Sequence, residues 1–97
     1  MGKVEWKSIL QDEDDRKCYI CGSSFNLHKH HAWHGTGNRK LAEEDGLYLR
    51  LCAFCHRELH DKGTNDRQLM RIAENAYLAH FNATVEDFIK RYGKNVI

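Results

Sequence analysis

The chain has 97 residues, of which 41% are hydrophobic, and its mean hydropathy of −0.72 allows only one small core. Fifteen Lys and Arg residues oppose fourteen Asp and Glu residues, so the net charge of +1 does not by itself indicate a nucleic-acid-binding protein. Because the sequence has no proline and no long apolar run, we expect no Pro-rich linker, membrane span or signal peptide, and therefore a cytoplasmic domain.

Residues 1–17 combine a few apolar side chains with an acidic run. Trp6, Ile9 and Leu10 have helical spacing, which predicts a short helix or turn whose apolar side docks on the body of the protein. The acidic residues 12–15 are neighbours in sequence and do not converge, so we interpret them as a solvated segment and not as metal ligands.

Two strands are predicted in the middle of the chain. Residues 26–33 have the composition of a strand, and residues 47–51 alternate in the period of two that is typical of a half-buried strand. Gly35, Gly37 and Asn38 indicate that a loop begins after the first strand and runs to Gly46. We expect the two strands to pair across this long loop.

Three helices are predicted in the second half of the chain. A helical pattern over 53–61 ends at Lys62-Gly63, which is typical of a C-cap. Apolar residues recur with helical spacing over 69–77, with Asn65 or Asp66 as the N-cap. The last helix begins at a capping box formed by Thr84 and Asp87 and ends at Gly93, and we prefer this reading of Thr84 to a glycosylation sequon.

Four cysteines occur as two CxxC pairs, Cys18-x-x-Cys21 and Cys52-x-x-Cys55. Each pair can supply two thiolates from one tight turn, and two such turns complete a tetrahedral zinc site. The thirty residues between Cys21 and Cys52 are enough for a β-hairpin between the pairs. We therefore predict a structural zinc site with four cysteine ligands; two disulfides or a redox CxxC are the alternatives.

Histidines provide a second candidate site. His56 and His60 are four residues apart on a predicted helix, so both side chains point from one face towards a common metal. His30 and His31 are adjacent on a predicted strand and point to opposite faces, so one can complete a three-histidine site while the other acts as a base. The alternative is a second, purely structural zinc bound by all four histidines.

The order of these motifs resembles the HNH nuclease family, many members of which carry a double zinc knuckle around a ββα-metal fold. The resemblance covers roughly residues 18–62, and the doubled histidine with HxxxH is most similar to colicin-type DNases. It implies an α+β fold with a ββα-metal core stapled by the four-cysteine zinc site (18–62). From the length of the chain we expect a single domain over 1–97, in which an N-terminal segment (1–17) and a C-terminal helical extension (64–97) flank this core.

The resemblance also implies roles for particular residues. His31 is the expected general base, and His30, His56 and His60 are the expected ligands of one catalytic divalent metal: magnesium, manganese, nickel or zinc. The expected reaction is hydrolysis of DNA phosphodiester bonds. The flanking segments look like small phage and prophage HNH proteins. This resemblance implies a location in a bacterium or a phage-infected cell. The expected partner is DNA, and a second copy of the chain or a phage protein is a further candidate.

One position departs from the family pattern. The central asparagine that orients the base histidine should fall near Leu47, and leucine makes no hydrogen bond. We expect Asn38, His34 or a backbone carbonyl to orient His31 instead, although Asn38 is equally well explained as a turn residue.

Basic residues beside the predicted site are candidate phosphate contacts. They are Arg39, Lys40, Arg57, Lys62 and Arg67. The alternative function, favoured by Leu47 and the near-neutral charge, is a catalytically silent nucleic-acid-binding, inhibitory or adaptor module on the same scaffold.

Overall fold

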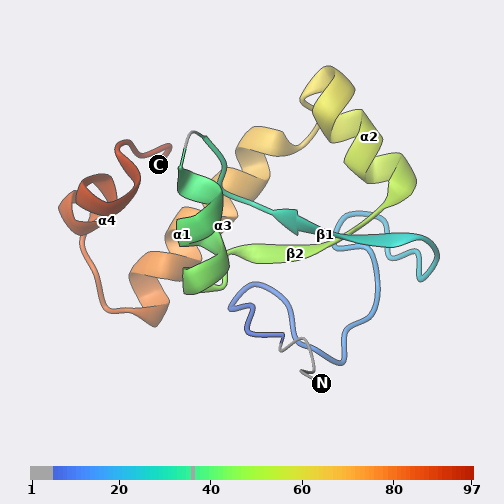
Figure 1. The fold of residues 1–97 in the computed structure, drawn as a ribbon, viewed down its shortest axis with the longest axis horizontal. Helices are drawn as coiled ribbons and strands as arrows, with labels where there is room; N and C mark the ends of the chain where they lie inside the picture. The colour runs from blue at the N-terminus through green and yellow to red at the C-terminus, as the bar shows by residue number, and fades with distance from the viewer. Residues whose placement is uncertain (1–5, 36) are drawn as a thin grey trace.

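The computed structural model describes residues 6–35 and 37–97 as a small α+β protein. Over these residues it contains one two-stranded antiparallel sheet and four helices (Figure 1). In chain order the elements are β1 (Leu27–His31), α1 (Asn38–Asp45), β2 (Tyr48–Cys52), α2 (Ala53–Lys62), α3 (Asp66–His80) and α4 (Val85–Tyr92). In Figure 1, α2 and α4 lie at opposite ends of α3. None of the described helices has the length and apolar character to cross a membrane.

The sheet forms where the two strands were predicted, with each strand's ends shifted or trimmed. β1 and β2 pair antiparallel, from Leu27 opposite Cys52 to His31 opposite Tyr48. Strand β2 is covered more completely than its alternating pattern predicts, since Tyr48, Leu49 and Leu51 are all buried. The reason is that other segments cover both of its faces.

Residues 6–17 cover part of β2 as irregular chain with turns, which is the second of the two expected alternatives, a short helix or a turn. Trp6 packs edge-on against Tyr48 at 4.8 Å, and the Arg50 guanidinium lies 3.9 Å from the centre of the Trp6 ring. Gln11 accepts a hydrogen bond from the Arg50 backbone N–H at 2.8 Å. Residues 12–17 are exposed, as expected for the acidic run. Residues 1–5 of this prediction lie outside the described part.

The predicted loop between the strands, from Gly35 to Gly46, is wrong for most of its length, because Asn38–Asp45 form helix α1. Residues 38–45 are mostly good helix formers, so the segment can be helical with little apolar periodicity. Leu41 and Ala42 alone face the core, which is why the pattern was inconspicuous. Gly37 and Gly46, both with positive φ, cap the helix at its two ends.

The other helices begin and end close to their predicted positions. α2 begins after Cys52 and is capped by Gly63. α3 begins after Asn65, whose side chain makes no cap hydrogen bond. The capping box at α4 is confirmed: Thr84 Oγ1 accepts from the Asp87 N–H at 3.1 Å, and Asp87 accepts from the Thr84 N–H at 3.0 Å.

The core joins all of these elements. Trp33, just after β1, packs against Phe88 and Tyr92 of α4, with ring centres 4.8 and 5.7 Å apart. Asp45, at the end of α1, binds Arg91 Nε at 2.6 Å and the Tyr92 hydroxyl at 2.5 Å. α4 is thereby tied to α1, on the side of the molecule away from α2 (Figure 1).

Candidate metal centres

The four cysteines converge at the junction of β2 and α2. Their Sγ atoms all lie within 4.8 Å of one another. Cys21 Sγ and Cys52 Sγ are 3.7 Å apart, close to the roughly 3.8 Å expected for two thiolates on one tetrahedral zinc with Zn–S bonds of about 2.3 Å. Backbone amides point at the sulfurs: Cys21 N–H donates to Cys18 Sγ, and Cys55 N–H donates to Cys52 Sγ. This four-cysteine cluster is compatible with structural zinc.

The cluster also perturbs the acidity of its own thiols. Burial opposes ionisation of Cys18, but backbone hydrogen bonds at Cys21, Cys52 and Ile20 outweigh it and lower the Cys18 pKa from 9.0 to about 6. Burial and the neighbouring sulfurs raise the pKa of Cys55. Without a cation, therefore, the cluster favours ionisation of one thiol and opposes that of its neighbour. Zinc would supply the positive charge that several adjacent thiolates need.

Three histidines form the second group. Nitrogens of His30, on β1, and of His56 and His60, on α2, lie within 4.8 Å of one another. The Nε2 atoms of His56 and His60 are 3.0 Å apart, near the roughly 3.3 Å expected for two imidazoles on one tetrahedral zinc. These residues could hold a metal ion, and they are the three predicted as ligands.

Two properties of His30 suit it to a metal. The residue is 5% exposed, and its Nε2 atom has no hydrogen-bond partner within the described chain. A buried imidazole nitrogen without a partner is costly, and a cation would satisfy it. Burial, with the nearby His56 and His60, lowers the His30 pKa from 6.5 to about 4. Burial likewise lowers the pKa of His56, so both rings are neutral, as ligands must be.

His28 is a neighbour of this group that sequence reasoning missed. Its Nδ1 atom lies 3.3 Å from Nδ1 of His56, on the side of that ring away from His60. A hydrogen bond there leaves the His56 Nε2 lone pair directed towards His60 and His30. The available signal was the alternation of His28 and His30 along one strand.

His31 lines the same cavity as the three-histidine group. The cavity has a volume of about 350 Å³ and is bounded by residues of β1, the following loop, α1 and α2. Its lining residues are Lys29, His30, His31, His34, Gly35, Arg39, His56 and His60. The predicted base and the predicted ligands therefore share one cavity.

Glu43 of α1 is the polar partner of His31. The Nε2 atom of His31 lies 2.7 Å from Glu43 Oε1, and the Lys29 ammonium lies 2.8 Å from the same carboxylate. The hydrogen bond from Lys29, followed by that from His31, lowers the pKa of Glu43 below its usual 4.5, so the group is a carboxylate at neutral pH. Sequence reasoning missed Glu43 because its segment was predicted to be a loop.

The structure does not bring the expected orienting residues to His31. The Asn38 side-chain amide donates to the backbone carbonyl of Tyr92 at 3.1 Å, and no hydrogen bond between Asn38 and His31 occurs among the described residues. His34 Nε2 lies 2.9 Å from the carboxylate oxygens of Asp66. Leu47 is fully buried in the core, so its position offers no group to the site.

Of the five predicted phosphate contacts, two line a pocket and three do not. Arg39 lines the histidine cavity, and Arg57 lines a separate pocket on α2. The remaining three, Lys40, Lys62 and Arg67, are not among the lining residues of either, and Lys62 forms an ion pair with Glu58 at 3.4 Å.

Comparison of the chain with models of known families, with curated proteins and with solved structures gives no match. The class of protein is therefore described from its own fold and site. It is a small α+β protein with a four-cysteine cluster that could bind zinc and a three-histidine group beside a fourth histidine.

Proposed function

We propose that the protein is a metal-dependent endonuclease of the HNH kind that hydrolyses phosphodiester bonds in DNA. The observation that supports this most directly is the convergence of His30, His56 and His60 in the cavity that His31 also lines. Structural zinc sites usually have four protein ligands, whereas this group has three histidines, and His31 beside it pairs with Glu43. The ββα-metal description then applies to β1, β2 and α2, of which β1 carries His30 and His31 and α2 carries His56 and His60.

His31 is the proposed general base. When its Nε2 carries the ring proton and donates a hydrogen bond to Glu43, the Nδ1 lone pair is free to accept a proton from water. The water oxygen bonds to phosphorus as the P–O3′ bond breaks. As in the family the chain resembles, the products are then a 5′-phosphate and, after protonation from solvent, a 3′-hydroxyl.

The other residues of the cavity bind the substrate and the metal. His30, His56 and His60 would hold a divalent ion, which when bound supplies Lewis acidity towards the phosphate. Arg39 lies in the cavity wall, where its guanidinium can hold a non-bridging phosphate oxygen. Glu43 takes the orienting role that the missing asparagine has in the family, and Lys29 fixes the other side of that carboxylate.

Cleavage of supercoiled plasmid, with magnesium, manganese, nickel and zinc tested in turn, is the direct test. We expect nicked and linear products from the parent protein, and at least a hundredfold slower cleavage by His31→Ala. His31→Ala should still bind the divalent ion in calorimetry, whereas His60→Ala should bind it more weakly, because His60 is a proposed ligand and His31 is not.

The matched control is His80→Ala, which removes an exposed histidine at the end of α3 and should change neither property. Cleavage by His31→Ala at the parent rate would show that His31 is not the base. Plasmid binding without cleavage under every ion would instead favour the silent binding module, which the buried Leu47 also favours.

A further inference from the structure

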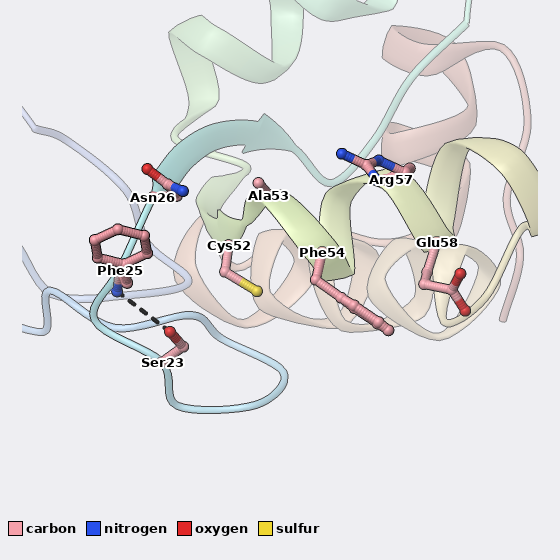
Figure 2. A pocket seen from close by; sticks show the side chains of 8 residues that line it. All are labelled: Ser23, Phe25, Asn26, Cys52, Ala53, Phe54, Arg57 and Glu58. Atoms are coloured by element: carbon pink, nitrogen blue, oxygen red, sulfur yellow. Dashed lines mark hydrogen bonds between the residues drawn. The ribbon is translucent and has the colours of Figure 1, made fainter.

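Two phenylalanines stand exposed on one side of the four-cysteine cluster. Phe25 is 74% exposed and Phe54 is 61% exposed, the highest fractions among the large exposed hydrophobic residues. Both line a pocket of about 420 Å³ that is separate from the histidine cavity. Figure 2 shows Phe25 at one end of this pocket, Glu58 at the other, and Phe54 and Arg57 between them. We call this pocket the aromatic groove.

The groove is held in place by the fold. The Ala53 N–H donates to the Asn26 carbonyl at 2.9 Å, which joins the segment carrying Phe25 to the start of the helix carrying Phe54. The Phe25 N–H donates to Ser23 Oγ at 3.2 Å. Both phenylalanines therefore project from backbone that the sheet and the four-cysteine cluster already order, so a ligand would bind with little loss of conformational freedom.

The polar residues of the groove favour a nucleotide over a purely apolar ligand. Arg57 offers guanidinium donors for a phosphate, and Asn26 and Ser23 offer groups for a base edge. Glu58 is the acidic residue of the groove, and its ion pair with Lys62 at 3.4 Å offsets part of its charge. Planar aromatic side chains next to a phosphate-binding arginine are typical of sites for unpaired bases.

Helix geometry connects this groove to the histidine cavity. Successive residues of an α-helix are rotated by about 100°, so Arg57 lies about 60° from Phe54 on one side and about 60° from His60 on the other. Arg57 thus stands between the two sites. A phosphate bound at Arg57 would have one neighbouring nucleotide towards the metal ligands and the other towards the phenylalanines.

On the basis of the proposed nuclease function, we propose that the aromatic groove binds an unpaired nucleobase of the strand that is cut in the histidine cavity. A base inside a duplex cannot stack on Phe25 or Phe54, because its faces are already covered by its neighbours. The substrate is therefore DNA with a single-stranded segment, such as a free strand, a flap or a bubble, in preference to a continuous duplex.

Binding of a short fluorescein-labelled oligothymidine, compared with a labelled duplex of equal length, tests this inference by fluorescence anisotropy. It is measured with the His31→Ala protein, so that cleavage does not interfere. Adding Phe25→Ala or Phe54→Ala should weaken single-strand binding roughly 5- to 100-fold and change duplex binding little. Phe54→Trp should retain single-strand affinity, since the larger ring also stacks.

Phe81→Ala is the matched control, because Phe81 is 46% exposed but follows α3, outside the groove. Unchanged melting temperatures would show that the variants are folded. Single-strand binding at the parent affinity by both groove variants would overturn the inference, and the groove would then be a docking face for another protein. Plasmid cleavage by the parent protein would in that case still support the proposed nuclease function. Equal weakening on strand and duplex would also overturn it. Failure of the parent to bind or cleave any DNA would overturn both proposals.

Discussion

The carboxylate of Glu43 contacts two residues of the proposed active site. It accepts from Lys29 and contacts His31, and it reaches both from a helix that joins the two strands. A carboxylate against one imidazole nitrogen selects the tautomer in which the other nitrogen is unprotonated. The orientation of the proposed base thus depends on a residue distant from it in sequence.

Glu43→Gln keeps the shape of this side chain and removes its charge. We expect the cleavage rate constant to fall roughly tenfold to a hundredfold, because His31 loses its preferred tautomer, while KM and metal affinity change little. Steady-state kinetics on plasmid together with calorimetric metal binding would measure these quantities.

Glu44→Gln is the matched control, since Glu44 neighbours Glu43 and pairs only weakly with Arg91, at 3.4 Å. A parent-like rate constant for Glu43→Gln would exclude an orienting role. A fall in metal affinity as large as the fall in rate would indicate that Glu43 supports the ligands and not the base.

Single residues differed in how well the sequence predicted them. The cysteines and His56 and His60 could be found because their spacing along a turn or a helix already places them together. Glu43 could not, because its meeting with His31 depends on how α1 packs against β1. Asn38 failed as an orienting residue for the same reason: the packing of α4 against α1 turns its amide towards Tyr92.

At the scale of the elements, the turn from α1 into β2 restricts which residue can stand at position 46. Gly46 ends α1 with a φ of 75°, and its carbonyl accepts from the Ile9 N–H at 2.9 Å. A Cβ atom there would meet the Lys7 carbonyl oxygen at 2.4 Å. The glycine is therefore required both by its own conformation and by the close approach of the N-terminal segment.

Gly46→Ala should destabilise the protein by roughly 3 kcal/mol, since it adds a backbone clash to the cost of a left-handed alanine. Gly63→Ala is the comparison: Gly63 ends α2 with a φ of 72°, but its Cβ would meet no atom within 4 Å. It should cost only about 1 kcal/mol. Urea unfolding of the two variants measures the difference, and equal losses would contradict the packing described here.

Elements were predictable where the signal was local. The capping box of α4 and the glycine that ends α2 are contained within a few residues, and both were found. α1 was missed because only two of its residues face the core, and because glycines at both ends of it are equally typical of a loop. The burial of both faces of β2 depends on residues 6–17, which no pattern within the strand reveals.

At the scale of the whole molecule, the core is small and the four-cysteine cluster lies at its edge. Cys18 and Cys52 are buried members of that core, so the proposed zinc ligands also pack against apolar side chains. A domain with a core this modest gains stability from a metal or a disulfide. Zinc binding and folding should therefore be coupled.

Metal analysis of protein prepared under reducing conditions should find tightly bound zinc, and chelation should unfold the chain reversibly. Cys52→Ala should be largely unfolded in circular dichroism, because it removes a ligand, a core side chain and the cap of α2. His60→Ala, which alters only the histidine group, should remain folded. An intact fold without zinc would refute the structural role of the cluster.

Cys52 ends β2 and caps α2, and it therefore sets the rotational phase of that helix. One residue inserted between Cys55 and His56 would turn both helix histidines by about 100° away from His30. The connection over residues 32–47 is fixed in a different way, because Trp33 and Asp45 contact α4 and Gly46 meets the N-terminal segment. The spacing between the second cysteine pair and the histidines should thus admit no change in length if the three histidines are to meet.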